Sequence, residues 1–275
     1  MKKRNKKTVA LLNRLITVVI IIGTLIMAYP FLSQFYYMAK ENGEAILFEK
    51  QVEKMPDREI ENKMKTYKLY NESLIASISE KKDKDITDAV NQYKKMASQH
   101  EKIGYLSVPK INQNLPIFTG VSDEMLESGV GQMQGTSLPI GGKASHSVLA
   151  AHSGLPNVRL FTDLNKLRVG DEFYISNIKG TIAYKVDNIK VVLPTNFSDL
   201  SIDKNKDYVT LMTCTPYRIN THRLLVRGHR IPYNKNVKEE KRKVLYKIVL
   251  TILIVLILMI IGILYFRKRR KKKKQ

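Results

Sequence analysis

The chain has 275 residues, with 47 lysines and arginines against 25 aspartates and glutamates, which gives a formal net charge of +22 at pH 7. The length suits one ordinary domain with attached segments. A charge this high can indicate a nucleic-acid partner, but much of it lies in the tails 1–7 and 267–274, and the middle of the chain has no basic surface interleaved with aromatic residues. We therefore expect no nucleic-acid partner. One cysteine excludes an internal disulfide, and no residues have the spacing of metal ligands, so we expect no cofactor.

The first apolar run extends from Leu15 to Leu32 and follows the basic tail. It has two interpretations, a cleaved signal peptide or an uncleaved membrane anchor. The run is long for the apolar part of a signal peptide, and no Ala-x-Ala cleavage site follows it. We therefore expect an uncleaved anchor.

The second apolar run, Ile248 to Phe266, is close to the roughly 20 residues that span a bilayer. The alternative is a buried core helix, which the adjacent basic tail argues against. Lysine and arginine next to membrane spans mark the cytoplasmic side. The sequence therefore predicts a cell-membrane protein with two spans, both termini in the cytoplasm and the intervening residues outside. The predicted parts are a basic tail with the first span at 1–33, a helical segment at 34–102, a β-rich domain at 103–233, a linker at 234–247, the second span at 248–266 and a basic tail at 267–275.

Residues 36–98 are rich in lysine, glutamate and asparagine, with apolar residues at helical spacing. We expect one helix up to a break at Pro56, a second from Glu59 to Tyr67, a charged loop at Ser77–Asp88 and a third helix at Ala89–His100. Such a segment can serve as a solvated spacer between the membrane and the domain.

From Ile103 onward, short β-branched and aromatic runs are separated by turn signals, a pattern typical of a β-barrel or a β-sandwich. Short helices are expected at 123–127, capped by Ser122 or Asp123, and at Phe161–Leu167. The predicted strands are Ile103–Val108, Leu115–Phe118, Ser147–Ala151, Glu172–Asn177, Thr181–Val192, Val209–Cys214 and Arg223–Ile231.

The only cysteine, Cys214, ends the strand that begins near Tyr208. Pro216 cannot donate a hydrogen bond to a sheet, so the strand should end at or just after Cys214. A second strand, His222–Ile231, follows a short loop and should lie beside the first. A thiol at a strand end with an arginine on the next strand suits a nucleophile with a cationic helper, whereas the alternative is a buried structural cysteine.

Several separated motifs resemble those of the sortases, the cysteine transpeptidases of Gram-positive cell surfaces. Thr210-Leu-Met-Thr-Cys214 with Arg223 downstream and His152 upstream is similar to the TLxTC…R signature of that family. The longer strings 213–217 and 220–230, together with 135–142, 151–156 and 160–164, resemble the pilin-polymerising branch, class C. The likeness covers about Ile103 to Pro232. It implies the closed β-barrel of sortases, so the expected fold is mainly β, with short helices, an N-terminal helical segment and one membrane helix at each end.

A thiol nucleophile needs a proton-transfer partner, and the chain has five histidines to supply it. They are His100, His146, His152, His222 and His229. His152 follows the apolar strand 147–151 and precedes a Gly/Pro loop, a position that suits the rim of a cleft. Spacing alone does not exclude His222 and His229 as the proton-transfer partner, and the resemblance selects His152.

An arginine near the thiol can stabilise a developing oxyanion with its rigid fork of donors. Arg223, Arg227 and Arg230 all lie on the second strand, and Arg227 shares a strand face with Arg223. A surface ion pair is the more common role of an arginine. The resemblance selects Arg223. This chain differs from the family pattern at two positions near the site. It has Ser153 where the family often has arginine, and Arg218 where the family often has glycine.

The resemblance implies that Cys214 attacks an LPxTG-like sorting signal between Thr and Gly. His152 acts as the acid and base, and Arg223 stabilises the oxyanion. The acyl group then passes to a lysine amine of a pilin subunit. The alternatives are a sortase that uses a cell-wall amine to anchor surface proteins to peptidoglycan, a hydrolytic cysteine protease, and a membrane-tethered scaffold without enzymatic activity. The order His, Cys, Arg does not suit a papain-like protease, which places cysteine first.

Class C sortases carry a lid over the active site, anchored by an Asp-Pro-aromatic or similar motif. Neither Asp83 nor Asp85 is followed by proline. We therefore expect residues 73–98 to form a degenerate lid or none.

Overall fold

The computed structural model describes residues 43–76, 84–155 and 158–234, together with a few separate positions between 14 and 29. Within these residues no helix has both the length and the apolar character needed to cross a bilayer. The predicted span 248–266, most of the span 15–32, nearly all of the linker 234–247 and both basic tails lie outside the described residues.

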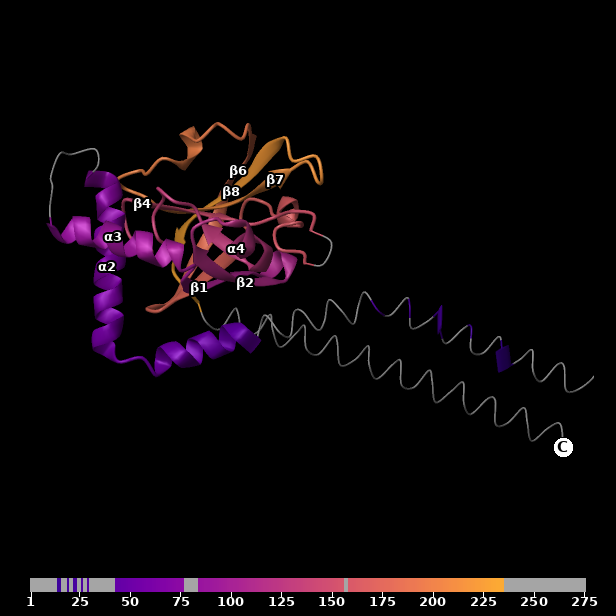
Figure 1. Ribbon diagram of the computed structural model, residues 1–275. Helices are drawn as coiled ribbons and strands as arrows, with labels where there is room; N and C mark the ends of the chain where they lie inside the picture. Colours follow the sequence, from indigo (N-terminus) through magenta and orange to yellow (C-terminus); the bar gives the residue numbers. More distant parts are fainter. Residues whose placement is uncertain are drawn as a thin grey trace, which may run out of the picture. The chain divides into compact units, whose positions relative to one another are not determined.

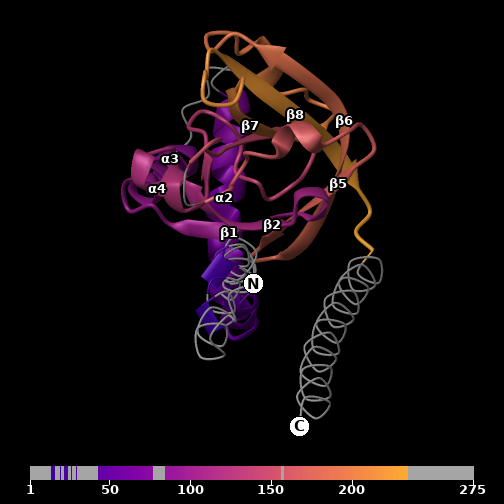
Figure 2. The same ribbon diagram turned by 90° about the vertical axis from the view of Figure 1, so that its right-hand side faces the viewer.

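Eight strands close into a barrel in the order β1-β2-β3-β4-β7-β8-β6-β5, so the prediction of a mainly-β closed barrel is confirmed. Figure 2 shows β7, β8, β6 and β5 following one another around one side of it. The strand bounds are β1 Lys102–Val108, β2 Gln113–Thr119, β3 Val130–Gln132, β4 Ser145–Ala150, β5 Glu172–Asn177, β6 Gly180–Val192, β7 Asp207–Thr215 and β8 His222–Ile231.

The barrel interior is filled by the alternate side chains that the period of a β-strand turns inward. Leu211 of β7, Leu149 of β4 and Val226 of β8 are fully buried there, together with the rings of Phe173 and Tyr184, which stack with centroids 5.5 Å apart. Because β7 turns Leu211 and Thr213 inward, it turns Thr210, Met212 and Cys214 to the outer face.

Two strand pairs are parallel, β2 with β3 and β4 with β7. The second pair decides the geometry of the candidate site. Two parallel neighbours place their carboxyl ends at the same edge of a sheet. The residues that follow β4 therefore lie beside the end of β7.

The N-terminal helices pack against the barrel rather than forming a solvated spacer (Figure 1). Residues 43–53 are helical, and α2 (Asp57–Ala76) begins after the expected break at Pro56. The Tyr70 ring of α2 stacks on that of Tyr93 in α3 (Lys84–Ser98), with centroids 3.9 Å apart. The Asn71 amide donates to the carbonyl of Leu138 and accepts from its N–H, at 3.1 and 2.7 Å.

The expected loop at Ser77–Asp88 is wrong in its second half, because α3 begins at Lys84. Ala89, Tyr93 and Met96 are buried at helical spacing and anchor the helix to the core. Asp85 in the first turn adds a favourable charge at the helix N-terminus. The charged residues before Ala89 therefore form the exposed first turn of a helix.

The short elements of the barrel domain match the predictions in part. The helix α4 (Asp123–Ser128) follows Ser122 as expected, although the Ser122 hydroxyl makes no capping bond. The predicted helix 161–167 is wrong, since only Leu164–Lys166 forms a 3₁₀ turn. Phe161, Leu164 and Leu167 are buried at a spacing of three residues, which suits 3₁₀ geometry better than an α-helix.

Gly228 of β8 allows the Phe173 ring to pack directly on the backbone. A Cβ built at this position would lie 2.6 Å from one ring carbon and 2.8 Å from another. We expect Gly228→Ala to reduce the free energy of unfolding by about 1–3 kcal/mol, measured by chemical denaturation, because the core must shift to admit the methyl group. Gly43→Ala is the matched control, since a Cβ there meets nothing within 4 Å. Equal stability of the two variants would contradict this packing.

Candidate active site

Cys214 and Arg223 face each other across two antiparallel strands. They are register partners in the β7–β8 pair, next to Thr213 opposite Leu224, so the predicted neighbouring strands are confirmed. Directly opposed residues point to the same face of a sheet, with Cα atoms about 5 Å apart. Cys214 is a free thiol and half-buried, and β7 ends one residue after it, as expected. The thiol and the guanidinium therefore start from adjacent positions on the outer face.

His152 reaches the same edge from β4. The parallel register pairs Ala150 with Met212, and its continuation sets His152 beside Cys214. Two bonds hold this continuation in place. The N–H of Ala151 donates to the Met212 carbonyl at 3.2 Å, and the buried Thr213 hydroxyl donates to the Ala151 carbonyl at 2.7 Å. The residues just before His152 and just before Cys214 are thus bonded to each other.

The loop between β7 and β8 orients the arginine. Nη1 of Arg223 donates to the carbonyls of Asn220 and His222, each at 3.2 Å. The N–H groups of Ile219 and Asn220 both donate to the Pro216 carbonyl, which closes the loop on itself. These bonds hold the guanidinium at the end of the loop where β8 begins, next to the end of β7 that carries the thiol.

The loop after His152 packs against the β7–β8 loop. A Cβ built at Gly154, where φ is +84°, would lie 3.1 Å from the Tyr217 ring. The Arg218 guanidinium lies 5.4 Å from the centroid of the same ring. Ser153 and Arg218, the two departures from the sortase pattern, therefore belong to loops that meet beside Cys214.

The remaining histidines are engaged with other partners. His146 lies in a buried hydrogen-bond network, and the His229 ring pairs with Asp187 at 3.5 Å. The rings of His100 and His222 contact the hydroxyls of Ser122 and Thr221. Within the described part of the chain, the His152 ring has no hydrogen-bond partner. His152 is thus the histidine that the strand register sets beside Cys214 and whose ring has no hydrogen-bond partner among the described residues.

The other two arginines of β8 are also engaged. Arg227 donates to Asp187 at 2.9 Å and covers the Tyr208 ring, while Arg230 lies 3.7 Å from Asp207. Arg227 does share the outer face with Arg223, but it pairs with Thr210, four residues before Cys214. Of the three candidates, the strand register brings only Arg223 opposite the thiol.

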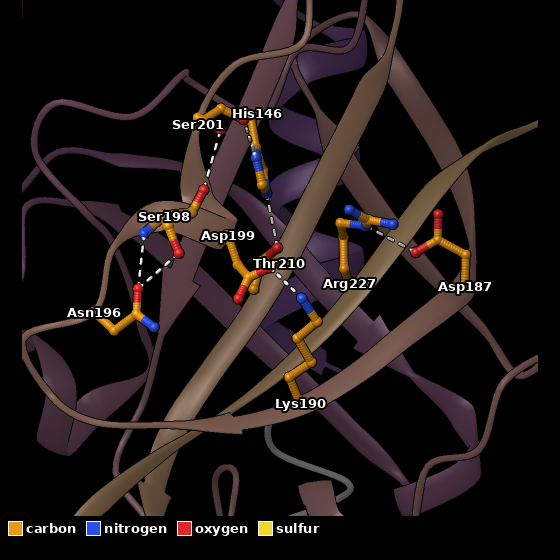
Figure 3. A network of polar contacts seen from close by, with 9 residues as sticks. All are labelled: His146, Asp187, Lys190, Asn196, Ser198, Asp199, Ser201, Thr210 and Arg227. Atoms are coloured by element: carbon orange, nitrogen blue, oxygen red, sulfur yellow. Dashed lines mark hydrogen bonds and ion pairs between the residues drawn. The ribbon is translucent and has the colours of Figure 1, made fainter.

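A network of polar contacts joins His146 of β4 and Thr210 of β7 to the loop between β6 and β7 (Figure 3). The His146 ring lies between the Ser201 carbonyl, 3.0 Å from Nδ1, and the Thr210 hydroxyl, 2.7 Å from Nε2. A carbonyl only accepts, so Nδ1 carries the proton and Nε2 accepts from Thr210. Together with the ion pair between Lys190 and Asp199, these bonds attach the loop between β6 and β7 to the sheet.

Burial of the His146 ring lowers its pKa below the ordinary 6.5, and the positive charge of Arg227 lowers it further. The bond to Ser201 and the charge of Asp187 oppose these effects. The folded chain thus takes up this proton less readily than the unfolded chain. The associated stability is complete above about pH 6.5 and is lost as the pH falls from there through the lower pKa of the folded state.

We therefore expect the melting temperature to fall as the pH is lowered from 7.5 to 5. The fall should be smaller in His146→Gln, because glutamine at this position has no ionisable group. His222→Gln, at a half-buried ring outside the network, serves as the control. A decline in His146→Gln as steep as in the parent chain would show that other groups cause the acid sensitivity.

Among the described residues, no group of three or more histidine, cysteine, aspartate or glutamate side chains is arranged to hold a metal ion. The chemistry that this part of the chain offers at Cys214 is that of a thiol, an imidazole and a guanidinium.

Comparison with known proteins adds an independent observation. The Sortase domain family matches residues 106–231. A crystal structure of sortase C1 from Streptococcus agalactiae shares 46% identity with a TM-score of 0.65, covering 69% of this chain and all of that one. A pilus-related sortase C of Group B Streptococcus shares 51% identity with a TM-score of 0.58, covering 68% of this chain and 96% of that one.

The chain belongs to the sortase family. Its identity to the two sortase C structures assigns it to class C. Sortase A of Bacillus anthracis is a more distant relative, 29% identical over 126 residues that make up 46% of this chain. The match spans 58% of the length of that relative. The residues that carry the match include the strands β4, β7 and β8, and therefore the site of this sortase.

Proposed function

We propose that the chain is a cysteine transpeptidase in which Cys214 is the nucleophile, His152 the acid and base, and Arg223 the oxyanion-stabilising group. One observation carries the proposal. The register of β4, β7 and β8 brings these three side chains to one edge of the sheet, although His152 precedes Cys214 by 62 residues in the sequence.

In the first half of the reaction, the Cys214 thiol gives its proton to His152, and the resulting thiolate attacks the carbonyl carbon of the scissile peptide bond. His152 donates this proton to the departing amine, which leaves a thioester on Cys214. In the second half, His152 takes a proton from an incoming amine as it attacks the thioester, and Cys214 leaves as a thiolate that regains this proton. Arg223 carries fixed donors toward the oxygen that becomes negative in both halves.

The substrate we propose is an LPxTG-like sorting signal cut between Thr and Gly, with a pilin lysine as the acceptor. Supporting evidence is the 51% identity to a sortase C described as pilus-related. The alternative acceptor is a cell-wall amine, which would anchor surface proteins to peptidoglycan. The two differ only in the nucleophile of the second half-reaction.

We further propose that the chain is held in the membrane at both ends, through 15–32 and 248–266, with the catalytic domain outside and both termini in the cytoplasm. The support is the sequence pattern of basic tails beside apolar runs. A substrate tethered to the same membrane would meet the enzyme at a raised effective concentration.

The proposed function is tested by mass spectrometry of the full-length protein in detergent, incubated with a peptide that contains Leu-Pro-x-Thr-Gly. We expect a thioester adduct at Cys214, absent from Cys214→Ala, that is discharged on addition of an amine. Absence of the adduct in the parent chain, with a folded protein by circular dichroism, would overturn the assignment. The thioester is then offered a lysine peptide or a cell-wall amine as the acceptor. The amine that discharges the thioester faster identifies which of the two proposed acceptors the enzyme prefers.

A lid is tested in the same assay. The region 73–98, for which a degenerate lid or none was predicted, includes α3, whose Tyr93 and Met96 are buried against the barrel. Deletion of this helix would therefore unfold the core, so only 77–83 is replaced by a glycine-serine linker. Faster adduct formation in that variant would support a lid, and an unchanged rate would exclude one in this segment.

A further inference from the structure

A cavity of about 1070 Å³ opens at the end of the barrel opposite to Cys214. It is lined by Asp207 and Tyr208 at the start of β7, and by Arg230 near the end of β8. Cys214 lies seven residues further along β7, which corresponds to about 23 Å at the usual rise of a strand. The cavity is thus a separate place from the candidate active site, and it has the size of a ligand pocket.

Positive charges from five different segments converge on this cavity. Lys68 comes from α2, Lys143 from the loop before β4, Lys179 from the turn between β5 and β6, Lys206 from the loop before β7, and Arg230 from β8. None of the four lysines pairs with a carboxylate among the residues that the structure describes. A cavity lined by one sign of charge concentrates ions of the opposite sign.

The two carboxylates in the cavity wall are already engaged. Asp187 accepts from Arg227 and faces the His229 ring. Asp207 accepts from the Tyr184 hydroxyl at 2.9 Å and from the N–H of Gly142 at 2.7 Å. The carboxylates therefore do not neutralise the lysines, and the cavity keeps an excess of positive charge.

The Arg230 guanidinium is held in place at this site. It lies 3.7 Å from Asp207 and 5.9 Å from the centroid of the Tyr184 ring. Gly141, where φ is +72°, passes close to the same guanidinium, and this backbone conformation favours glycine. A guanidinium fixed in this way loses little freedom when it binds an anion.

We propose that this cavity binds a phosphate-bearing polyanion, such as a chain of phosphate esters, independently of the transpeptidase site. A single carboxylate is neutralised by one cation, whereas four lysines without a carboxylate partner among the described residues, beside an arginine that already pairs with Asp207, suit closely spaced, multiply charged groups. A phosphate presents several acceptor oxygens to a guanidinium fork and to surrounding ammonium groups at once. Inorganic tripolyphosphate is the simplest probe with this charge density.

Lysine footprinting tests the proposal on the full-length protein, because it reports each lysine separately from those in the basic tails. The protein is acetylated with and without tripolyphosphate, and the rate at each lysine is read by mass spectrometry. We expect tripolyphosphate to slow the acetylation of lysines 68, 143, 179 and 206 at least about fivefold. All four rates should follow the same saturation curve against the tripolyphosphate concentration. Lys94 and Lys95, which are exposed on α3, should change less than twofold.

Two variants sharpen the test. Arg230→Gln should shift the saturation curve to about tenfold higher probe concentration, and Lys206→Gln, at an exposed position, should do so without lowering the melting temperature. The double variant Lys94→Gln/Lys95→Gln is the matched control for loss of charge and should leave the curve unchanged. Thioester formation at Cys214 should stay at the parent rate in all three.

Three results would overturn the proposal. One is protection of Lys94 and Lys95 equal to that of the cavity lysines, which indicates diffuse attraction by a basic protein. Another is an unshifted curve in both cavity variants. The third is stronger protection by a glutamate peptide of equal charge than by tripolyphosphate, which would assign the cavity to an acidic peptide.

Discussion

The His152→Gln variant is expected to form the Cys214 thioester about 10²–10⁴ times more slowly than the parent chain, because the departing amine loses its proton donor. Glutamine keeps the size and polarity of the side chain but cannot exchange a proton near neutral pH. The bond from the Thr213 hydroxyl to the Ala151 carbonyl should persist, since the His152 side chain takes no part in it. The melting temperature should therefore stay close to that of the parent.

The measurement is single-turnover thioester formation, followed by rapid quench and mass spectrometry. His222→Gln is the matched control, because His222 also lies near the thiol, opposite Thr215, but its ring bonds Thr221. If His222→Gln lost activity and His152→Gln kept it, the role of proton donor would be assigned to His222 instead of His152.

Arg223→Lys is expected to lower the rate about 10²–10³-fold although the charge is kept. An ammonium group presents no planar fork, so it cannot bond the loop carbonyls of Asn220 and His222 and still aim donors at the substrate oxygen. We expect the loss to appear in kcat rather than in KM, because the oxyanion exists only after the thiol attacks.

Arg218→Lys tests whether the fork matters only at position 223. Arg218 lies in the same loop and covers the Tyr217 ring, so it shares the neighbourhood without facing Cys214 in the strand register. Its rate should stay within about threefold of the parent. A loss as large as that of Arg223→Lys would mean that the loop as a whole, rather than one guanidinium, supports the reaction.

The sequence predicts most strands of this fold because they alternate buried and exposed residues or form short apolar runs. The strand β3 was missed because Val130, Gly131 and Gln132 are too few to show a period. The start of α3 was missed because its first turn is charged and gains its order from Tyr93 and Met96 further along. Elements that depend on tertiary packing leave little local signal.

The candidate site was predictable to a different degree. The neighbouring strands of Cys214 and Arg223 follow from a short connection, while the choice of His152 depended on the resemblance to sortases. The structure adds that Ala151 and Thr213 are bonded to each other, which no sequence spacing reveals. The His146 network and the basic cavity likewise join segments far apart in the chain, so no local pattern indicates that these residues belong together.

The position of β4 before β7 in the chain also means that the groups of the proposed site are completed in a fixed order during synthesis. His152 emerges from the ribosome 62 residues before Cys214, and Arg223 follows the cysteine by nine. Until β7 is complete, β4 lacks the neighbour that aligns its end, because a parallel pair requires the long crossover through β5 and β6. A nascent or truncated chain that stops before β7 therefore carries an imidazole and no thiol, and it cannot attack its own peptide bonds or those of its neighbours.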